Sequence, residues 1–205
     1  MRKSVLIDPV ADNMDKRDAF ATWLGQHKLA MTKGFFLEAV MIDYALLEER
    51  LLQMLWQMGF TDGTWTTKEK EVTLLPEQID FLKNVVKLYK QTDAGEDNGI
   101  SIGQITNKAK LVRCVAEWVI NVEGGYQDDP FLRDLKHRCE SLDIQYLLDT
   151  LEQIRQWSGY RNELTHALFN KNAETVKALL KDHAEAGLKY ARTLDSQIKT
   201  LKAQK

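Results

Sequence analysis

Proline and glycine are scarce in this sequence, which contains 3 prolines and 11 glycines among 205 residues. This scarcity argues against a fold made of many short segments joined by tight turns. Apolar residues instead recur at intervals of three and four, the period of amphipathic helices. We therefore expect an all-α protein, an up-down bundle of four or five long helices with accessory helices, in which residues 1–205 form one domain.

Long hydrophobic runs and cysteine clusters are also missing. No stretch approaches the roughly 18 uninterrupted apolar residues of a membrane-spanning helix. The apolar run near the N-terminus ends at Asp8-Pro9, which is short for a signal-peptide core. The two cysteines, Cys114 and Cys139, form neither a disulfide framework nor a metal-ligand spacing. We expect a cytoplasmic protein with no membrane contact, no bound metal and no cofactor.

Charge of one sign does not dominate the chain. The formal net charge is −2, but residues 171–205 contain eight Lys/Arg and four Asp/Glu, a balance of +4 that leaves −6 on residues 1–170. A basic C-terminal helix could contact a phosphate backbone, or it could be a solvated helix face. The charge balance alone therefore does not identify a nucleic-acid-binding protein.

Helical patterns and loop signals divide the chain into segments. Residues 1–13 are expected to be an irregular arm, and residues 59–73 and 92–99 to be loops. The expected helices cover residues 15–31, 35–58, 76–91, 101–123, 130–141 and 144–169, and a last helix starts at Asn170 or Asn172 and runs to near the C-terminus.

The most distinctive chemistry lies in residues 161–166, which read RNELTH within a helical pattern. Asn162 and His166 are four residues apart and share a helix face, and Arg161 lies on its flank. A guanidinium, an amide and an imidazole presented together suit phosphate binding and proton transfer. Leu164 and Leu168 continue an apolar face that excludes the polar residues, so we expect these to face solvent, a cleft or a second subunit. The alternative is a helix end that happens to be polar.

Arg161, a polar Asn162 directly after it, and His166, late in an all-helical chain, resemble the motif of HEPN domains. The resemblance implies a HEPN-like helical bundle and a metal-independent endoribonuclease acting as a toxin or in antiviral defence. It also implies a homodimer in which both copies of the motif form a composite active site, with an antitoxin or sensor protein as a further partner. HEPN toxins paired with nucleotidyltransferases carry a tyrosine two residues after the histidine, where this chain has Leu168. Regulation of that type is therefore not expected.

The implied chemistry is consistent with these three residue types. RNA cleavage without a metal requires the 2′-hydroxyl to lose a proton and the 5′-oxygen to gain one, and histidine can do both near neutral pH. Arg161 would hold the non-bridging phosphate oxygens, and Asn162 would orient the imidazole or bind the phosphate. His166 supplies one imidazole per chain, so a two-fold dimer would supply the second. The product would be a 2′,3′-cyclic phosphate.

Further residues are candidates for RNA binding. Lys108, Lys110 and Arg113 form a basic cluster on an expected helix, which could follow a phosphate backbone or be a solvated face. Trp157, one turn before the motif, could stack on a base or belong to the core. Gly159, inside a helical pattern, marks either a kink or a close approach of another backbone.

Two functional hypotheses remain open. The first is the endoribonuclease with Arg161, Asn162 and His166 at its catalytic site. The second is a HEPN-like bundle that binds nucleic acid or a protein partner without cutting. The other histidines, His27 and His183 among them, share no spacing, and we expect them to be structural or exposed.

Overall fold

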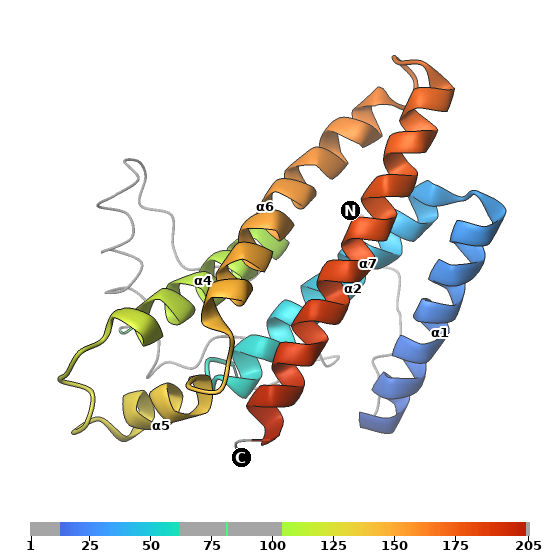
Figure 1. The fold of residues 1–205 in the computed structure, drawn as a ribbon. Helices are drawn as coiled ribbons and strands as arrows, with labels where there is room; N and C mark the ends of the chain where they lie inside the picture. The colour runs from blue at the N-terminus through green and yellow to red at the C-terminus, as the bar shows by residue number, and fades with distance from the viewer. Residues whose placement is uncertain (1–12, 62–80, 82–103, 204–205) are drawn as a thin grey trace, which may run out of the picture.

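Helices make up the fold in the computed structural model, which describes residues 13–61, 81 and 104–203. Figure 1 shows how they are arranged. They are α1 (Asn13–Lys33), α2 (Phe36–Gln57), α4 (Ile105–Asn121), α5 (Pro130–Cys139), α6 (Ile144–Ala167) and α7 (Ala173–Ala203). The prediction of an all-α bundle is confirmed. The expected arm, the helix over 76–91 apart from the helical Phe81, and the loops apart from residues 59–61 lie outside the described residues.

Local sequence signals set several helix ends. The Asp143 side chain accepts a hydrogen bond from the Tyr146 backbone N–H (3.0 Å) and caps α6. Asn172 accepts one from the Thr175 N–H (3.0 Å) and starts α7. Such caps satisfy amide groups that have no partner within the helix. One boundary differs from the expectation, because α4 begins at Ile105 instead of after Ser101.

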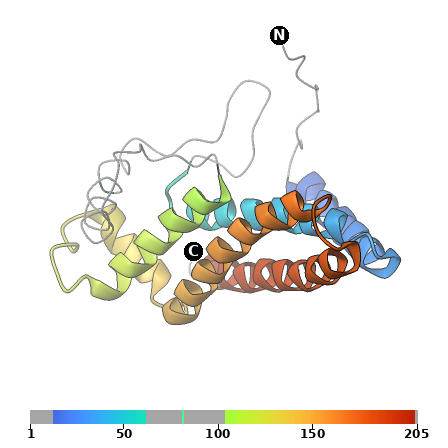
Figure 2. The same cartoon turned by 90° about the horizontal axis from the view of Figure 1, so that it is seen from above.

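The central element is α2, which packs against α7, α1 and α4, while α6 packs against α4 and α7. The wide apolar stripe of α2 explains this central position, because a stripe of that width is buried only when several helices pack against it. Helices α6 and α7 form an antiparallel pair whose connecting turn lies at the opposite end of α7 from the C-terminus (Figures 1 and 2). Residues 161–166 therefore lie near one end of the bundle. No helix among the described residues has the length and apolar character needed to span a membrane.

The closest backbone packing occurs at Gly187 of α7. A Cβ atom there would lie 2.8 Å from Asp43 Cβ and 2.8 Å from Trp157 Cζ2, so α7 meets α2 and α6 with no room for a side chain. Gly159, by contrast, is exposed, and a Cβ there would meet nothing within 4 Å. Helix α6 also continues without a break through this position. Within the chain, Gly187 and not Gly159 permits the close approach.

Candidate functional site

Arg161 lies near the C-terminal end of α6 and is half-buried. Its guanidinium carbon lies 4.2 Å from the centroid of the Tyr44 ring on α2, a cation–π contact. Its Nη2 donates a hydrogen bond to Asn162 Oδ1 at 2.8 Å. Its Nε is buried and has no hydrogen-bond partner. The Tyr44 ring and the Asn162 side chain thus hold the Arg161 guanidinium in place, while its Nε–H donates no hydrogen bond.

Four rings beside Arg161 form what we call the aromatic wall: Tyr44, Trp157, Tyr160 and His183. Trp157 and His183 stack in parallel, with centroids 4.5 Å apart and an interplanar angle of 4°. Tyr160 meets His183 edge to face at 5.6 Å, and Tyr44 lies 6.5 Å from Trp157. The indole Nε1 of Trp157 donates to the His183 carbonyl at 2.8 Å. The wall joins α2, α6 and α7, and its Tyr44 ring contacts the Arg161 guanidinium.

Asn162 and His166 are both exposed on α6. The five residues from Arg161 to His166 correspond to a rotation of about 140° around the helix axis, so the two side chains leave the helix in different directions. Near this end the Asn170 side chain donates to the His166 carbonyl at 3.3 Å. The chain therefore brings Arg161 and Asn162 together, but it places the imidazole apart from the guanidinium.

Beneath the wall lies a buried ion pair that the sequence did not single out. His27 Nε2 of α1 lies 3.1 Å from Asp43 Oδ1 of α2, and the two residues are 3% and 0% exposed. Burial raises the pKa of Asp43 to about 6, and the hydrogen bond with His27 offsets part of this effect. The sequence contains one indication of this pair: His27 lies on the apolar side of an amphipathic helix.

His183 was also expected to be merely structural or exposed, yet it contacts the site directly. It is 6% exposed and lies on the α7 stripe formed by Leu180, Ala184 and Gly187. Burial and, to a smaller extent, the nearby Arg161 charge lower the pKa of His183 to about 4. A histidine among small residues on an apolar stripe is the signal that could have identified it.

The prediction of RNA binding is wrong for two of the candidate residues, because both are buried. Trp157 is 4% exposed and is covered by His183 and Tyr44, so it has no free face for a base. Lys108 is 6% exposed, and its Nζ forms a 2.7 Å ion pair with Glu48 of α2. Both side chains serve the packing between helices, and neither is proposed further as an RNA contact.

Lys110 and Arg113 line a polar groove of about 710 Å³ between α4 and α6. Arg113 is ion-paired there with Glu117 (2.8 Å) and with Glu152 (3.1 Å). Hydrogen bonds from Arg155 and Gln156 lower the pKa of Glu152 to about 2. The groove holds carboxylates beside its cations, so only the exposed Lys110 retains the character expected of a phosphate contact.

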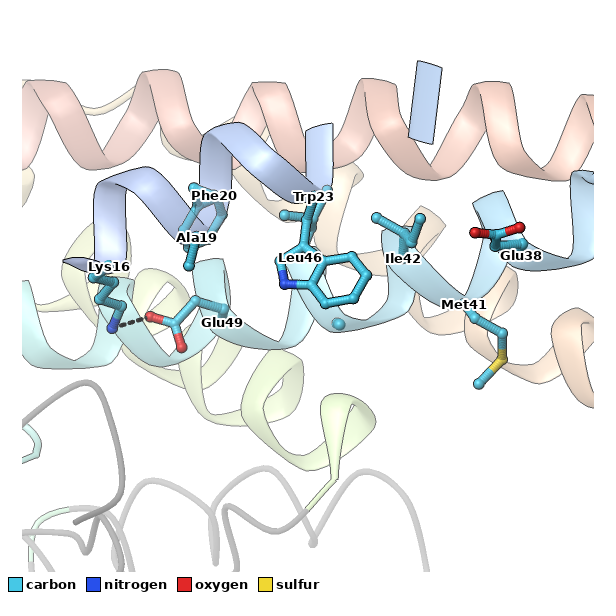
Figure 3. Close-up of a pocket in the computed structure, with 10 residues that line it drawn as sticks. Lys16, Ala19, Phe20, Trp23, Glu38, Met41, Ile42, Leu46 and Glu49 are labelled. Carbon is cyan, nitrogen blue, oxygen red and sulfur yellow. Dashed lines mark ion pairs between the residues drawn. The ribbon is translucent and has the colours of Figure 1, made fainter. Parts of the chain in front are cut away.

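An apolar groove of about 490 Å³ runs between α1 and α2 (Figure 3), and neither Arg161 nor His166 lines it. Trp23 and Met41, which are 54% and 50% exposed, lie along it. A half-buried Lys16–Glu49 ion pair lies at one end and Glu38 at the other. Helix α1 packs chiefly against α2, which explains why Trp23 remains exposed.

The described residues include two thiols. Cys114 and Cys139 are free and buried, and burial raises their pKa values to about 11 and about 12. Neither thiol is ionised near neutral pH, so neither is an activated nucleophile. No group of three His, Cys, Asp or Glu side chains in this part of the chain is arranged to hold a metal ion.

Comparison with known proteins gives no further assignment. The chain matches no protein-family model, no curated protein and no solved structure.

Proposed function

We propose that this protein is a metal-independent endoribonuclease of the HEPN type that acts as a toxin or antiviral effector. The observation that carries the proposal is the ordered guanidinium of Arg161, held against Tyr44 and Asn162, followed one turn later by the exposed imidazole of His166. A fixed cation and an accessible general acid or base on the same helix supply the two kinds of group that phosphodiester cleavage needs. The resemblance of residues 161–166 to the HEPN motif supports the same reaction.

In the proposed reaction the ribose 2′-oxygen forms a bond to phosphorus as the bond from phosphorus to the 5′-oxygen breaks. One His166 imidazole takes the proton of the 2′-hydroxyl, and a second, protonated imidazole donates a proton to the leaving 5′-oxygen. Arg161 stabilises the charge that develops on the non-bridging oxygens. The products are a 2′,3′-cyclic phosphate and a 5′-hydroxyl.

The positions of Arg161 and His166 on α6 favour a site completed by a second copy. One chain supplies one His166, and its imidazole leaves the helix about 140° away from Arg161. A two-fold axis near this end of α6 would bring two imidazoles and two guanidinium groups to one phosphate. We therefore propose a homodimer with a composite site, and an antitoxin or sensor protein that controls it.

The experiment is cleavage of a labelled RNA by the purified full-length chain in EDTA, with analysis of the product ends. We expect cyclic phosphates, and a specific activity that falls when the protein is diluted below the dimer dissociation constant. His166→Ala should lower the rate by about 100-fold or more, the lower end of what general acid–base catalysis contributes.

His137→Ala is the matched control, because His137 is also an exposed histidine and lies on α5. It should cleave at the wild-type rate. Undiminished cleavage by His166→Ala would show that the nuclease site lies elsewhere or that the activity is a contaminant.

One observation favours the second candidate, a bundle that binds nucleic acid or a protein without cutting. Arg161 is already engaged by Tyr44 and Asn162, as expected of an arginine whose main role is to join α6 to α2. This candidate predicts binding of RNA or of a protein partner with no new RNA ends in the same assay.

A further inference from the structure

Phe169 lies almost wholly in solvent, directly after the motif that carries His166. It is 95% exposed, whereas five of the seven phenylalanines in the chain are buried or half-buried. Leu168 keeps helical backbone angles (φ −50°, ψ −37°), so the chain still follows the helical path of α6 at that residue. Side chains three residues apart on a helix are neighbours, and Phe169 therefore follows the exposed His166 on the same side of the chain. An imidazole and an aromatic ring are presented to solvent together.

The turn that carries Phe169 lies at the same end of the bundle as the turn between α1 and α2 (Figure 1). Residues of both turns, Phe35 and Leu168 among them, line one groove of about 390 Å³. Phe35 is the other exposed phenylalanine, at 61%. The groove gives an extended ligand that leaves Phe169 a path across the end of the bundle.

Lysine side chains accompany these two turns. Lys33 lies at the end of α1, Lys171 lies between α6 and α7, and Lys177 lines the groove. All three are exposed, and none forms an ion pair with another described residue. The carboxylates of the same segments are Glu38 and Glu174, in the first turns of α2 and α7. Three cations thus remain available to phosphate groups at this end of the bundle.

A single strand of RNA fits this combination of groups. Its unpaired bases stack on exposed aromatic rings, and its phosphates attract lysine side chains. In a duplex the bases already stack on one another, so no base has a free face for a protein ring. A protein partner would account for the exposed ring but would leave the three lysines without a role. The position of the ring, three residues after His166, favours a ligand that also reaches the imidazole.

We propose that Phe169 is a base-stacking residue in a binding site for single-stranded RNA. The base next to the scissile phosphate stacks on Phe169, and the strand continues through the groove past Lys171 and Lys177. The place of that base beside the scissile phosphate rests on the proposed endoribonuclease function. Binding of the strand does not depend on that function.

The first test measures binding without cleavage. The probe is a short, unpaired, fluorescein-labelled RNA with every 2′-hydroxyl methylated, and fluorescence anisotropy gives its Kd for the full chain. Phe169→Ala should weaken binding by about 5- to 150-fold, the range produced by the loss of one stacked base. Phe169→Leu should weaken it equally, because leucine has no ring face, and Phe169→Trp should bind at least as tightly as wild type. Binding of the duplex form should not respond to Phe169→Ala.

Trp23→Ala is the matched control, because Trp23 is also an exposed aromatic residue, at 54%, and lines a different groove. It should bind the probe like wild type. Unchanged binding by Phe169→Ala would overturn the proposal. Wild-type binding by Phe169→Leu would also overturn it, since an apolar contact without stacking would then suffice. A Phe169→Ala variant that loses self-association and keeps RNA binding would assign the ring to a contact between copies.

The second test concerns the lysines. Lys171→Ala and Lys177→Ala should each reduce the slope of the logarithm of affinity against the logarithm of salt concentration by about 0.7, the value for one phosphate contact with a single strand. Lys181→Ala is the control, because Lys181 is exposed on α7 but pairs with Glu185 at 3.9 Å. Slopes that do not change for Lys171→Ala and Lys177→Ala would overturn the proposed path of the strand.

Cleavage of unmethylated RNA separates this site from the proposed function. A wild-type chain that binds the probe through Phe169 but produces no new RNA ends would refute the nuclease and leave the binding site established. A chain whose cleavage and binding are both unchanged by Phe169→Ala would refute the binding site and leave the nuclease standing.

Discussion

Arg161 and His166 lie on one helix, five residues apart, but in different surroundings. Arg161 is half-buried against Tyr44, whereas His166 is exposed near the end of α6. The inner residue depends on the packing of three helices, and the outer one depends only on its own helix. The comparison shows that one short motif can combine a rigidly held charge with an accessible acid–base group. If the proposed function holds, Arg161 serves both the packing of the helices and the reaction.

Substitutions of Arg161 and His166 should separate packing from catalysis, and they should have the largest effects on RNA cleavage. His166→Ala should lower RNA cleavage by about 100-fold or more without changing the melting temperature. Arg161→Ala should lower cleavage similarly and also lower the melting temperature by roughly 2–4 °C, since a cation–π contact is worth about 1 kcal/mol in a domain of this size. Cleavage assays and thermal denaturation measure both effects. Equal melting temperatures for the two variants would show that Arg161 contributes nothing to packing.

Gly187→Ala tests the packing around the aromatic wall, at the position where α7 lies against Asp43 and Trp157. The added methyl group would lie 2.8 Å from both Asp43 Cβ and Trp157 Cζ2, so the helices must move apart. Overpacking of this kind costs about 1–3 kcal/mol, and denaturant unfolding should show a loss of this size. Because Trp157 belongs to the aromatic wall, cleavage should fall as well. An unchanged free energy of unfolding would mean that α7 can shift without cost.

The sequence predicted the helices better than it predicted their neighbours. The three-and-four spacing was sufficient to place α2, α6 and α7, because periodicity is a local property. Burial is not local. Trp23 and Trp157 have similar helical spacings, but α6 packs against α4 and α7, whereas α1 packs chiefly against α2, so only Trp157 is covered. Lys108 seemed part of a basic surface until the fold placed it against Glu48, sixty residues away in the chain.

The same limit applies to the candidate site. Residues 161–166 were recognisable because their chemistry lies within two helical turns. The supporting residues Tyr44 and His183 come from α2 and α7, and no spacing in the sequence connects them to Arg161. The apolar pattern that Gly159 interrupts predicted either a kink or a close approach there, whereas Gly187 is the glycine that lies against two neighbouring helices.

The buried side chains of His183 and Asp43 should make the free energy of unfolding depend on pH. The pKa of His183 is about 4 in the folded chain against an ordinary value of 6.5, so between these values the unfolded chain binds more protons. The contribution of neutral His183 is complete above pH 6.5 and is lost as the pH falls towards 4. Asp43, with its pKa raised from 3.8 to about 6, acts in the opposite direction, because its contribution is present at low pH and is lost as the pH rises through 6.

A non-titrating residue at position 183 isolates the histidine contribution. The melting-temperature difference between wild type and His183→Gln should be largest above pH 6.5 and should shrink by several degrees at pH 4.5, with 1 kcal/mol corresponding to roughly 2–4 °C. Asp43 is common to both proteins, so its effect cancels in the difference. A difference that stays constant with pH would show that His183 titrates normally in the folded chain.

Gly159→Ala should have the smallest effect on stability, and it tests the exposed face of α6. Gly159 is exposed in the middle of α6 with open space around its Cα, so alanine should stabilise the single chain by about 0.5–1 kcal/mol through its helix propensity. If two copies of α6 approach each other there, as the proposed composite site requires, the added methyl group would hold them apart. The variant should then be more stable as a monomer, form a weaker dimer and cleave RNA more slowly, which sedimentation and dilution assays would measure. A more stable chain with unchanged dimer affinity would place the subunit contact elsewhere and would leave Gly159 with no role beyond that of a tolerated glycine.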